Sequence, residues 1–295
     1  MFKGVFTALI TPFRDGEIDQ VALAGLVEFQ IANGIHGLVP CGTTGESATL
    51  SHDEHREVIR RVVELVGGRV PVLAGTGSNC TRESVELTRY AKSVGANGAL
   101  LITPYYNKPT PDGLVAHYET IARSVDLPLV LYNVPGRTAV DMKAETVLRL
   151  VHLPQVVGIK EATADLERAA RLHAACGDSF TLLSGDDGTF LPFLAIGGHG
   201  VISVTSNVAP HRMVKLWERW QAGDLFGARQ EHEALLPLHA LMFCETNPIP
   251  VKAAAVLRGL CTPEIRLPLT PLSEGRREAL RQAMARLGLL PEGHA

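Results

Sequence analysis

Short apolar segments recur along the chain and predict buried β-strands. There are eight, at residues 5–10, 36–39, 70–73, 98–102, 129–132, 156–160, 180–183 and 201–204. Segments with helical spacing of apolar positions lie between them, at 21–32, 54–66, 83–94, 114–124 and 166–175. Because strands and helices alternate, we expect parallel strands joined by crossover helices, and hence an α/β fold.

The pattern changes after about residue 206. From there the sequence predicts only helices, at 213–220, 225–241, 250–257 and 276–289. We therefore expect a (β/α)8 TIM barrel over residues 1–206, extended to about 224, and a C-terminal helical domain over 225–295. A doubly wound open sheet is the alternative, but the Gly-x-Gly-x-x-Gly loop typical of its first strand is absent.

Several junctions carry helix start and stop signals. Ser51 followed by Glu54 has the form of a capping box at the start of a helix. Gly34, Gly67 and Gly95 lie where three predicted helices end, as expected for residues that tolerate a left-handed backbone.

Composition narrows the class of protein. The chain has 295 residues, of which 46% are hydrophobic and 20% charged, as in one large globular domain with an appendage. A net charge of −3 argues against a nucleic acid or an anionic membrane as partner, since either requires a basic face.

Cysteine usage and the absence of targeting signals suggest the compartment. The five cysteines show no paired spacing, so neither a zinc site nor a disulfide framework is expected. No signal peptide precedes the first predicted strand, and no apolar run reaches membrane-spanning length. We expect a soluble cytoplasmic protein.

Lys160 closes the apolar segment 156–160 and is the leading candidate for chemistry. Burying an ammonium ion is costly unless it is paired or loses its proton. The lysine therefore either reaches solvent from an edge strand or is held there for its amine. The carboxyl ends of barrel strands carry the active site, which favours the second interpretation. Burial favours the neutral amine, which attacks a carbonyl and forms an imine.

Polar side chains follow the ends of the other predicted strands. They are Thr7, Thr11, Thr43, Thr44, Tyr105, Tyr106, Tyr132 and Arg137. Hydroxyls, a guanidinium and an amine, without a histidine–carboxylate pair, suit imine chemistry better than hydrolysis. Tyr132 is the candidate proton donor and acceptor, and its alternative role is an aromatic plug in the barrel mouth.

Three further features have structural as well as functional explanations. The Gly-Thr-Thr-Gly-Glu turn at 42–46 either binds a carboxylate through its N–H groups or is an ordinary connecting loop. Arg137 follows a Pro-Gly turn and either binds a carboxylate or forms a surface ion pair. His52 and His55 lie on one side of a helix without further ligands, so we expect a solvated face and no metal.

Five linked motifs resemble the dihydrodipicolinate synthase (4-hydroxy-tetrahydrodipicolinate synthase) family of class I pyruvate-dependent aldolases. They are Cys-Gly-Thr-Thr-Gly-Glu-Ser at 41–47, Thr-Pro-Tyr-Tyr-Asn at 103–107, Tyr-Asn-Val-Pro-Gly-Arg-Thr at 132–138, Gly-Ile-Lys-Glu-Ala at 158–162 and Ser-Gly-Asp-Asp at 184–187. The resemblance runs from residue 2 to about 290. It implies a (β/α)8 barrel with a C-terminal helical extension, a homotetramer built as a dimer of tight dimers, and a place in diaminopimelate and lysine biosynthesis.

The resemblance also implies catalytic roles. Lys160 would form the imine with pyruvate, and Tyr132 would donate and accept protons. Thr43 would complete a proton relay with Tyr106, which would reach in from the neighbouring subunit. No metal or organic cofactor is implied, because the lysine itself withdraws the electrons.

Substrate contacts follow from the same resemblance. Thr44 and Ile202 would contact pyruvate, with the threonine holding its carboxylate, and Gly185 would be a further substrate-binding residue. Arg137 would bind the carboxylate of L-aspartate 4-semialdehyde. The enamine would attack the aldehyde of that substrate, whose own amine would then cyclise and displace Lys160.

An inhibitory site for L-lysine is implied at the tight-dimer interface. The matching positions are Ser47, Ala48, His52, His55, Asn79, Glu83 and Tyr105. Tyr105 and Tyr106 are adjacent in the sequence and would couple the effector to the active site.

Two other functions remain as alternatives. N-acetylneuraminate lyase and related 2-keto-3-deoxy sugar acid aldolases share the turn, the tyrosine and the lysine, but Arg137 and the Thr43-Thr44 pair favour the synthase. A non-catalytic barrel that binds a keto acid as a sensor would have no use for a buried amine beside a proton relay. Trapping of a pyruvate imine would separate an enzyme of either kind from a barrel that only binds its ligand.

Overall fold

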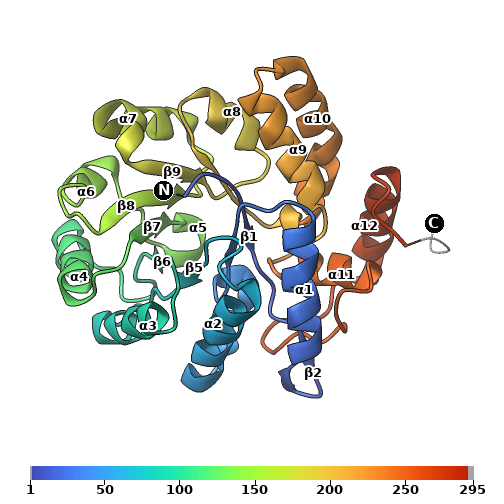
Figure 1. Cartoon of the computed structure of the whole chain (residues 1–295), viewed down its shortest axis with the longest axis horizontal. Helices are drawn as coiled ribbons and strands as arrows, with labels where there is room; N and C mark the ends of the chain where they lie inside the picture. The colour runs from blue at the N-terminus through green and yellow to red at the C-terminus, as the bar shows by residue number, and fades with distance from the viewer. Residues whose placement is uncertain (1, 292–295) are drawn as a thin grey trace. The chain divides into compact units, whose positions relative to one another are not determined.

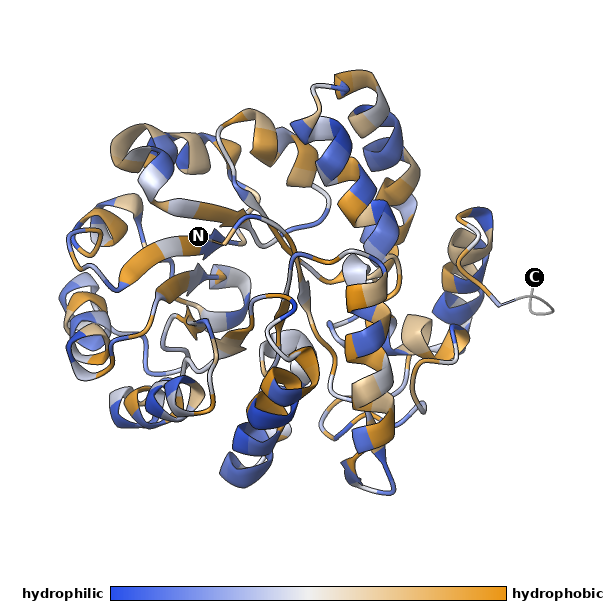
Figure 2. Cartoon of the chain, viewed as in Figure 1, coloured by the Kyte–Doolittle hydropathy of each residue, from blue (hydrophilic) through white to orange (hydrophobic). Residues whose placement is uncertain are grey.

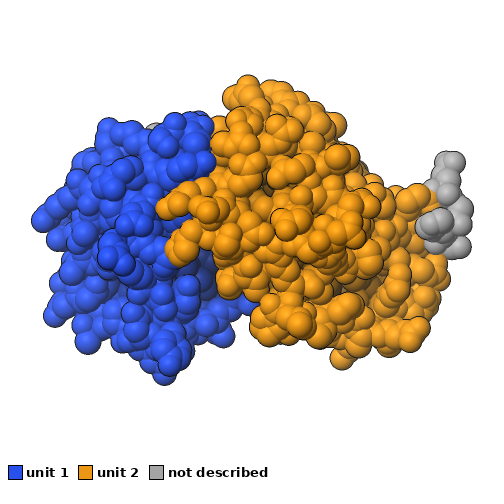
Figure 3. Space-filling model, turned by 90° about the horizontal axis from the view of Figure 1, so that it is seen from below, with its two compact units in different colours: residues 1–4, 71–202 blue, residues 5–70, 203–295 orange. Residues whose placement is uncertain are grey.

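The computed structural model describes residues 2–291, and the chain divides into two compact units (Figure 3). Of the described residues, unit 1 comprises 2–4 and 71–202, and unit 2 comprises 5–70 and 203–291. The predicted domain boundary near residue 224 stays a prediction. Among the helices of residues 2–291, none is both long and apolar enough to cross a membrane.

Unit 1 is built on parallel strands that pair in chain order. They are β5 (Leu73–Gly75), β6 (Gly98–Ile102), β7 (Leu129–Asn133), β8 (Val156–Glu161), β9 (Thr181–Ser184) and, apart from its last residue, β10 (Gly200–Ser203). The helices of this unit are α3 (Thr81–Ser93), α4 (Pro111–Ser124), α5 (Pro135–Thr138), α6 (Ala144–Leu148), α7 (Leu166–Cys176) and α8 (Phe190–Ala195). Figure 1 shows α3, α4, α6 and α7 lying outside the strands.

The core of unit 1 lies between these strands and helices. Leu131 and Ile159 are fully buried and pack in one cluster with Tyr118 of α4. The strands are predominantly hydrophobic, whereas the helices carry both kinds of residue (Figure 2). A Cβ atom on Gly158 would lie 2.3 Å from the carbonyl oxygen of Thr181, so β8 and β9 approach closely only because this residue is glycine.

Unit 2 holds β1 (Gly4–Ala8), apart from its first residue, in parallel pairing with β4 (Gly37–Val39). A small antiparallel pair, β2 (Phe13–Arg14) and β3 (Glu17–Ile18), follows β1. The helices are α1 (Gln20–Ala32), α2 (His52–Val66), α9 (Pro210–Gln221), α10 (Leu225–Leu241), α11 (Ile249–Leu257) and α12 (Glu274–Arg286). The Asn207 carboxamide donates to the Ala8 carbonyl at 2.7 Å and accepts from the Ile10 N–H at 3.1 Å.

The predicted order of elements is confirmed, with some bounds shifted. All eight predicted parallel strands occur in the described part of the chain. The third begins at Leu73 rather than residue 70, and Pro71 just before it has no N–H to offer a strand ladder. The capping box is confirmed, since the Ser51 N–H donates to Glu54 at 2.7 Å and the Glu54 N–H to the Ser51 hydroxyl at 3.2 Å. The β2–β3 hairpin and the short helices were missed because too few residues show a period.

His117 is a buried titratable group in unit 1. Its ring Nδ1 lies 2.9 Å from the Thr81 hydroxyl, and its Nε2 is buried without a hydrogen-bond partner among residues 2–291. Burial lowers the pKa of His117 from 6.5 to about 4. The folded protein therefore holds this ring neutral where an unfolded chain would bind a proton.

We expect His117 to make the protein less stable in acid. Below pH 6.5 the unfolded state binds a proton that the folded state takes up only near pH 4, so folded-state stability falls as the pH drops through this window. A shift of this size corresponds to at most about 3 kcal/mol. Urea unfolding measures the free energy of unfolding at pH 7 and at pH 4. The difference between the two values should be smaller in His117→Gln than in the wild type, by up to that amount.

The exposed His152 supplies the control for this measurement. His152→Gln should keep the pH dependence of the wild type. If His117→Gln also keeps it, the buried ring is not the source of the acid sensitivity.

Candidate active site

Lys160 and Tyr132 are direct partners on neighbouring strands of unit 1. They lie side by side in the register of β7 and β8, and each is 6% exposed. The Lys160 Nζ lies 4.2 Å from the centroid of the Tyr132 ring. Among residues 2–291 no carboxylate forms an ion pair with this amine. Because β8 lies between β7 and β9, the interpretation of Lys160 as an edge-strand lysine reaching solvent is wrong.

Gly185 leaves room for the lysine side chain. A Cβ atom at this position would lie 2.5 Å from the Ala162 Cβ and 3.0 Å from the Lys160 Cε. The Gly185 N–H also donates to the Glu161 carbonyl at 2.7 Å, which holds the end of β9 against β8. Ile202 lies on β10 of the same unit and is 1% exposed.

Tyr106 projects from the surface of the subunit. It lies in the loop between β6 and α4, is 90% exposed, and has a left-handed backbone with φ of 70°. Such a backbone costs a residue of this size roughly 1–3 kcal/mol, so the surrounding loop must impose it. The Asn107 carboxamide helps by donating to the Asn79 carbonyl at 2.9 Å.

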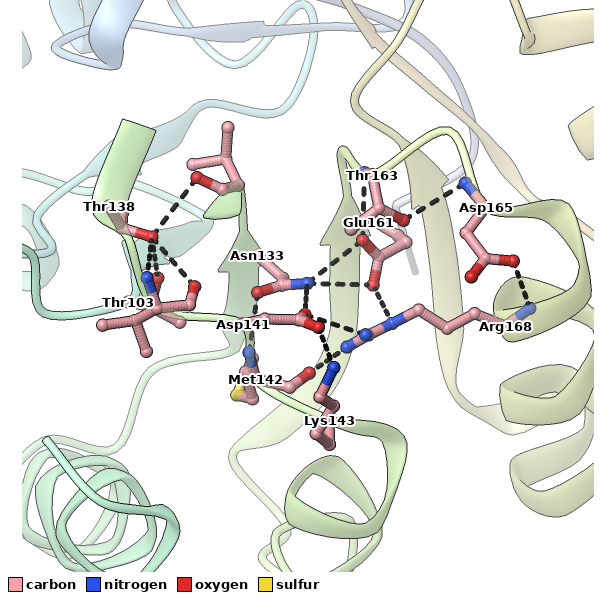
Figure 4. Close-up of polar contacts among 12 residues, drawn as sticks. Thr103, Asn133, Thr138, Asp141, Met142, Lys143, Glu161, Thr163, Asp165 and Arg168 are labelled. Carbon is pink, nitrogen blue, oxygen red and sulfur yellow. Dashed lines mark hydrogen bonds and ion pairs between the residues drawn. The ribbon is translucent and has the colours of Figure 1, made fainter. Parts of the chain in front are cut away.

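Arg137 lies on a single helical turn rather than on the simple turn predicted. This is α5, which begins at Pro135. The Thr103 hydroxyl donates to Thr138 at 3.3 Å, and the Thr138 hydroxyl donates to the Val140 carbonyl at 2.9 Å, which ties α5 to the end of β6 (Figure 4). Arg137 itself is exposed.

Unit 1 contributes three of the positions predicted for an L-lysine site. They are Asn79, Glu83 and Tyr105. The Ser78 hydroxyl donates to the Glu83 carboxylate at 2.5 Å. Burial, and after it the negative charge of Glu83, raises the pKa of the Tyr105 phenol.

Unit 2 contributes the remaining four, around the start of α2. Ser47 and Ala48 lie in a short 3-10 helix, and His52 is exposed at the first position of α2. His55 is 8% exposed, so the predicted solvated face is wrong for this residue. In the described part of the chain no three His, Cys, Asp or Glu side chains are grouped as metal ligands.

The turn at 42–46 holds Thr43 and Thr44 in a 3-10 helix of unit 2. Thr44 is 3% exposed, and its hydroxyl accepts a hydrogen bond from the Asn247 carboxamide at 3.0 Å. Thr43 is half-buried. Asn247 precedes α11 more than two hundred residues further along the chain, so no local spacing indicated its role.

A buried ion pair fixes the end of this turn. Glu46 has a left-handed backbone with φ of 54° and pairs with Lys252 of α11. The Lys252 Nζ also donates to the Glu264 carbonyl at 2.9 Å, and the Arg266 N–H donates to Glu46 at 3.0 Å. Burial lowers the pKa of Lys252, against the opposing pull of the Glu46 carboxylate. The C-terminal segment therefore holds the turn that carries both threonines.

A second network, also unassigned from the sequence, lies in unit 1 on the face of β7 and β8 opposite Lys160 and Tyr132. Figure 4 shows its hydrogen bonds and ion pairs. Its members are Asn133, Asp141, Lys143, Glu161 and Arg168. Burial raises the pKa of Glu161, although the Arg168 guanidinium opposes the shift. For Asp141 the effect of burial is outweighed by hydrogen bonds from Lys143 and Asn133, so its pKa is lowered. A glutamate directly after the strand lysine was the only sequence signal.

Comparison with known proteins identifies the family to which the chain belongs. The model of the Dihydrodipicolinate synthetase family matches residues 1–287. The chain belongs to this family. The 4-hydroxy-tetrahydrodipicolinate synthase of Magnetococcus marinus is 64% identical over 292 residues, covering 99% of this chain and all of that protein.

Solved structures of the family agree with this membership. The synthase from Methylacidiphilum fumariolicum is 46% identical with a TM-score of 0.96, covering 98% of this chain and 96% of that one. The enzyme of Acinetobacter baumannii, solved in complex with pyruvate, is 46% identical with a TM-score of 0.95, covering 98% and 100%. That of Cyanidioschyzon merolae, solved with lysine bound, is 41% identical with a TM-score of 0.95, covering 98% and 99%.

These matches confirm the predicted family and the (β/α)8 barrel with C-terminal helices. They also confirm the predicted class of enzyme, a pyruvate-dependent lyase of the class I aldolase type. The roles of individual site residues stay predictions.

We expect Lys252→Met to destabilise unit 2. The side chains of Lys252 and Glu46 are 4% and 1% exposed, so the substitution leaves a buried carboxylate without its main counter-charge. Breaking such a pair costs about 3–5 kcal/mol, which denaturant unfolding measures. The double variant Glu46→Gln/Lys252→Met should recover part of the loss because no buried charge then remains unpaired.

Lys215→Met is the matched control, since Lys215 pairs with Glu231 but its side chain is 48% exposed. It should change the free energy of unfolding by at most about 1 kcal/mol. Equal stability of the two single variants would contradict a stabilising role for the buried pair.

Proposed function

We propose that this chain catalyses the condensation of pyruvate with L-aspartate 4-semialdehyde, through an imine on Lys160, in diaminopimelate and lysine biosynthesis. The observation that carries the proposal is the buried Lys160 amine beside Tyr132, with no carboxylate pairing it among residues 2–291. An unpaired buried amine is a poor structural element and a good nucleophile. The pyruvate complex of the Acinetobacter baumannii relative supports the first substrate.

The first half-reaction forms and activates the imine. The Lys160 amine attacks the ketone carbon of pyruvate, and water leaves as the C=N bond forms. The protonated imine withdraws electrons from the adjacent methyl group, which loses a proton to give an enamine. Tyr132 is proposed to move these protons, with Thr43 and Tyr106 as its relay, because each of these steps requires a proton donor or acceptor.

The second half-reaction forms the product. The enamine carbon attacks the aldehyde of L-aspartate 4-semialdehyde, whose carboxylate is held by Arg137. The amino group of that substrate then attacks the imine carbon and displaces Lys160, which regenerates the free enzyme. Thr44 is proposed to hold the pyruvate carboxylate, and Ile202 and Gly185 are proposed as further substrate-binding residues. Lys160 serves as electron sink throughout, so the proposed reaction uses no metal or organic cofactor.

The active enzyme is proposed to be a cytoplasmic homotetramer built as a dimer of tight dimers. The conformation of Tyr106 supports this assembly. An exposed tyrosine with a strained backbone is costly for an isolated subunit. That cost is explained if the side chain completes the proton relay of the neighbouring subunit.

We expect Lys160→Ala to lose nearly all turnover, by roughly 10³-fold or more, because the nucleophile is removed. Treatment of the wild type with pyruvate and sodium borohydride should leave a reduced pyruvyl adduct, which intact-protein mass spectrometry detects and peptide mapping assigns to Lys160. Lys160→Ala should carry no adduct. Lys92→Ala, on an exposed part of α3, is the control and should retain both adduct and turnover.

Each outcome separates the possible functions. Turnover of Lys160→Ala at the rate of the wild type would contradict the imine mechanism. No adduct on the folded wild type would favour a barrel that only binds its ligand. An adduct that reacts with sugar-acid aldehydes but not with L-aspartate 4-semialdehyde would indicate a lyase of the sialic acid type.

L-lysine is proposed as a feedback inhibitor, bound at Ser47, Ala48, His52, His55, Asn79, Glu83 and Tyr105. The lysine-bound structure of the Cyanidioschyzon merolae relative supports this ligand. A carboxylate such as Glu83 suits the lysine amines, and the adjacent Tyr105 and Tyr106 connect this site to the proposed proton relay.

We expect His55→Ala to weaken inhibition by L-lysine about tenfold while leaving kcat within a factor of two. The loss removes an effector contact and no catalytic group, and coupling energies of this size are typical of allosteric sites. Initial rates over a titration of L-lysine measure both quantities. His152→Ala is the control, because His152 is exposed and lies outside the proposed site; L-lysine should inhibit this variant as it inhibits the wild type. If millimolar L-lysine does not inhibit the wild type, the regulatory proposal is refuted.

A further inference from the structure

Two pairs of neighbouring residues occupy the ends of β7 and β8. In the register of these strands Tyr132 lies beside Lys160, and Asn133 lies beside Glu161. Successive residues of a strand point to opposite faces, so the second pair lies directly behind the first. Asn133 and Glu161 share their face with the core residues Leu131 and Ile159.

The Asn133 carboxamide connects the strand ends to the segment that follows α5. Its Nδ2 donates to Glu161 at 3.2 Å and to Asp141 at 3.1 Å. Its Oδ1 accepts the Met142 N–H at 3.0 Å. Asn133 is fully buried, and both ends of its amide are used, so the group fits only one orientation.

Arg168 of α7 closes the network (Figure 4). Its Nε donates to Glu161 at 2.8 Å, and a terminal nitrogen donates to Asp141 at 2.8 Å. The remaining nitrogen donates to the Met142 carbonyl. Lys143 adds an ion pair to Asp141 at 2.5 Å, so two carboxylates face two cations. A planar guanidinium that meets three acceptors resists both rotation and translation.

This arrangement exceeds what the fold requires. The side chains of Glu161 and Arg168 are 2% and 10% exposed, and a buried ion pair contributes little more to stability than apolar residues of the same shape. Its distinct physical property is directional rigidity. The network holds Asn133 and Glu161, which directly follow Tyr132 and Lys160 in the chain.

We propose that Asn133, Glu161, Arg168 and Asp141 position Lys160 relative to Tyr132 for proton transfer, with Arg168 as the residue on which the network depends. This rests on the proposed imine mechanism. None of the four contacts the reacting atoms, so they are positioning residues rather than catalytic ones. Their loss shifts the strand ends and lengthens the path of the proton, while leaving the amine able to capture pyruvate.

Arg168→Met tests the proposal, because methionine keeps an apolar side chain of similar length and removes the guanidinium group. We expect kcat to fall about 10- to 100-fold, as for other losses of supporting contacts, with KM for pyruvate changed less than threefold. Borohydride trapping at saturating pyruvate should still label Lys160 fully. Arg168→Lys, which keeps the charge but not the guanidinium group, should recover only part of kcat. All rates are measured well below the melting temperature of each variant.

The matched control is Arg171→Met on the same helix. Arg171 pairs with Glu167 four residues before it, and its side chain is 75% exposed. It should retain the kcat of the wild type. A kcat for Arg168→Met within twofold of this control, on folded protein, would overturn the proposal.

A purely structural role would lower the melting temperature and leave kcat intact at low temperature, which also overturns it. If Arg168→Met does not fold, Asp141→Ala decides, since Asp141 is 29% exposed and its loss should be tolerated. We expect a drop in kcat of about 3- to 10-fold, and an unchanged kcat refutes the proposal. Failure of the imine mechanism itself is distinguishable, because the wild type would then show no adduct.

Discussion

The lateral register of β7 and β8 is the constraint on which the candidate site of unit 1 depends. It brings Tyr132 beside Lys160 on one face and Asn133 beside Glu161 on the other. A slip by one residue would exchange these faces, burying the amine among helices and turning the charged network toward the reaction. Glycine contributes to the same constraint, because Gly158 permits the close approach of β9 and Gly185 leaves room for the lysine stem.

Each unit buries charge next to the residues proposed to act. In unit 1 Glu161 follows Lys160 and is held by Arg168; in unit 2 Glu46 follows the two threonines and is held by Lys252. Buried ion pairs rarely add much stability, but each of these ties a strand end or a turn to a helix from later in the chain. The β/α repeat thus supplies the strand ends and loops, and buried ion pairs hold them against helices.

Much of the fold and of the site was predictable from local pattern. Apolar segments of strand length alternate with helical spacing, and this pattern located eight strands and the C-terminal helices. Lys160 stood out because a charged residue at the end of an apolar strand is costly unless it is used. Pattern failed where elements are short, as for β2, β3 and α5, and where burial depends on packing, as for His55.

The sequence by itself determined the class of fold, the family and the candidate nucleophile, because periodicity and short motifs are local properties. It did not indicate the hydrogen bond from Asn247 to Thr44, the ion pair of Lys252 with Glu46, or the ion pair of Arg168 with Glu161, the residue after Lys160. The carboxamide and the two cations reach their partners only after helices pack on strands. Only the tertiary structure decided these contacts, since hydrogen bonds between distant residues depend on the close approach of elements that no local pattern encodes.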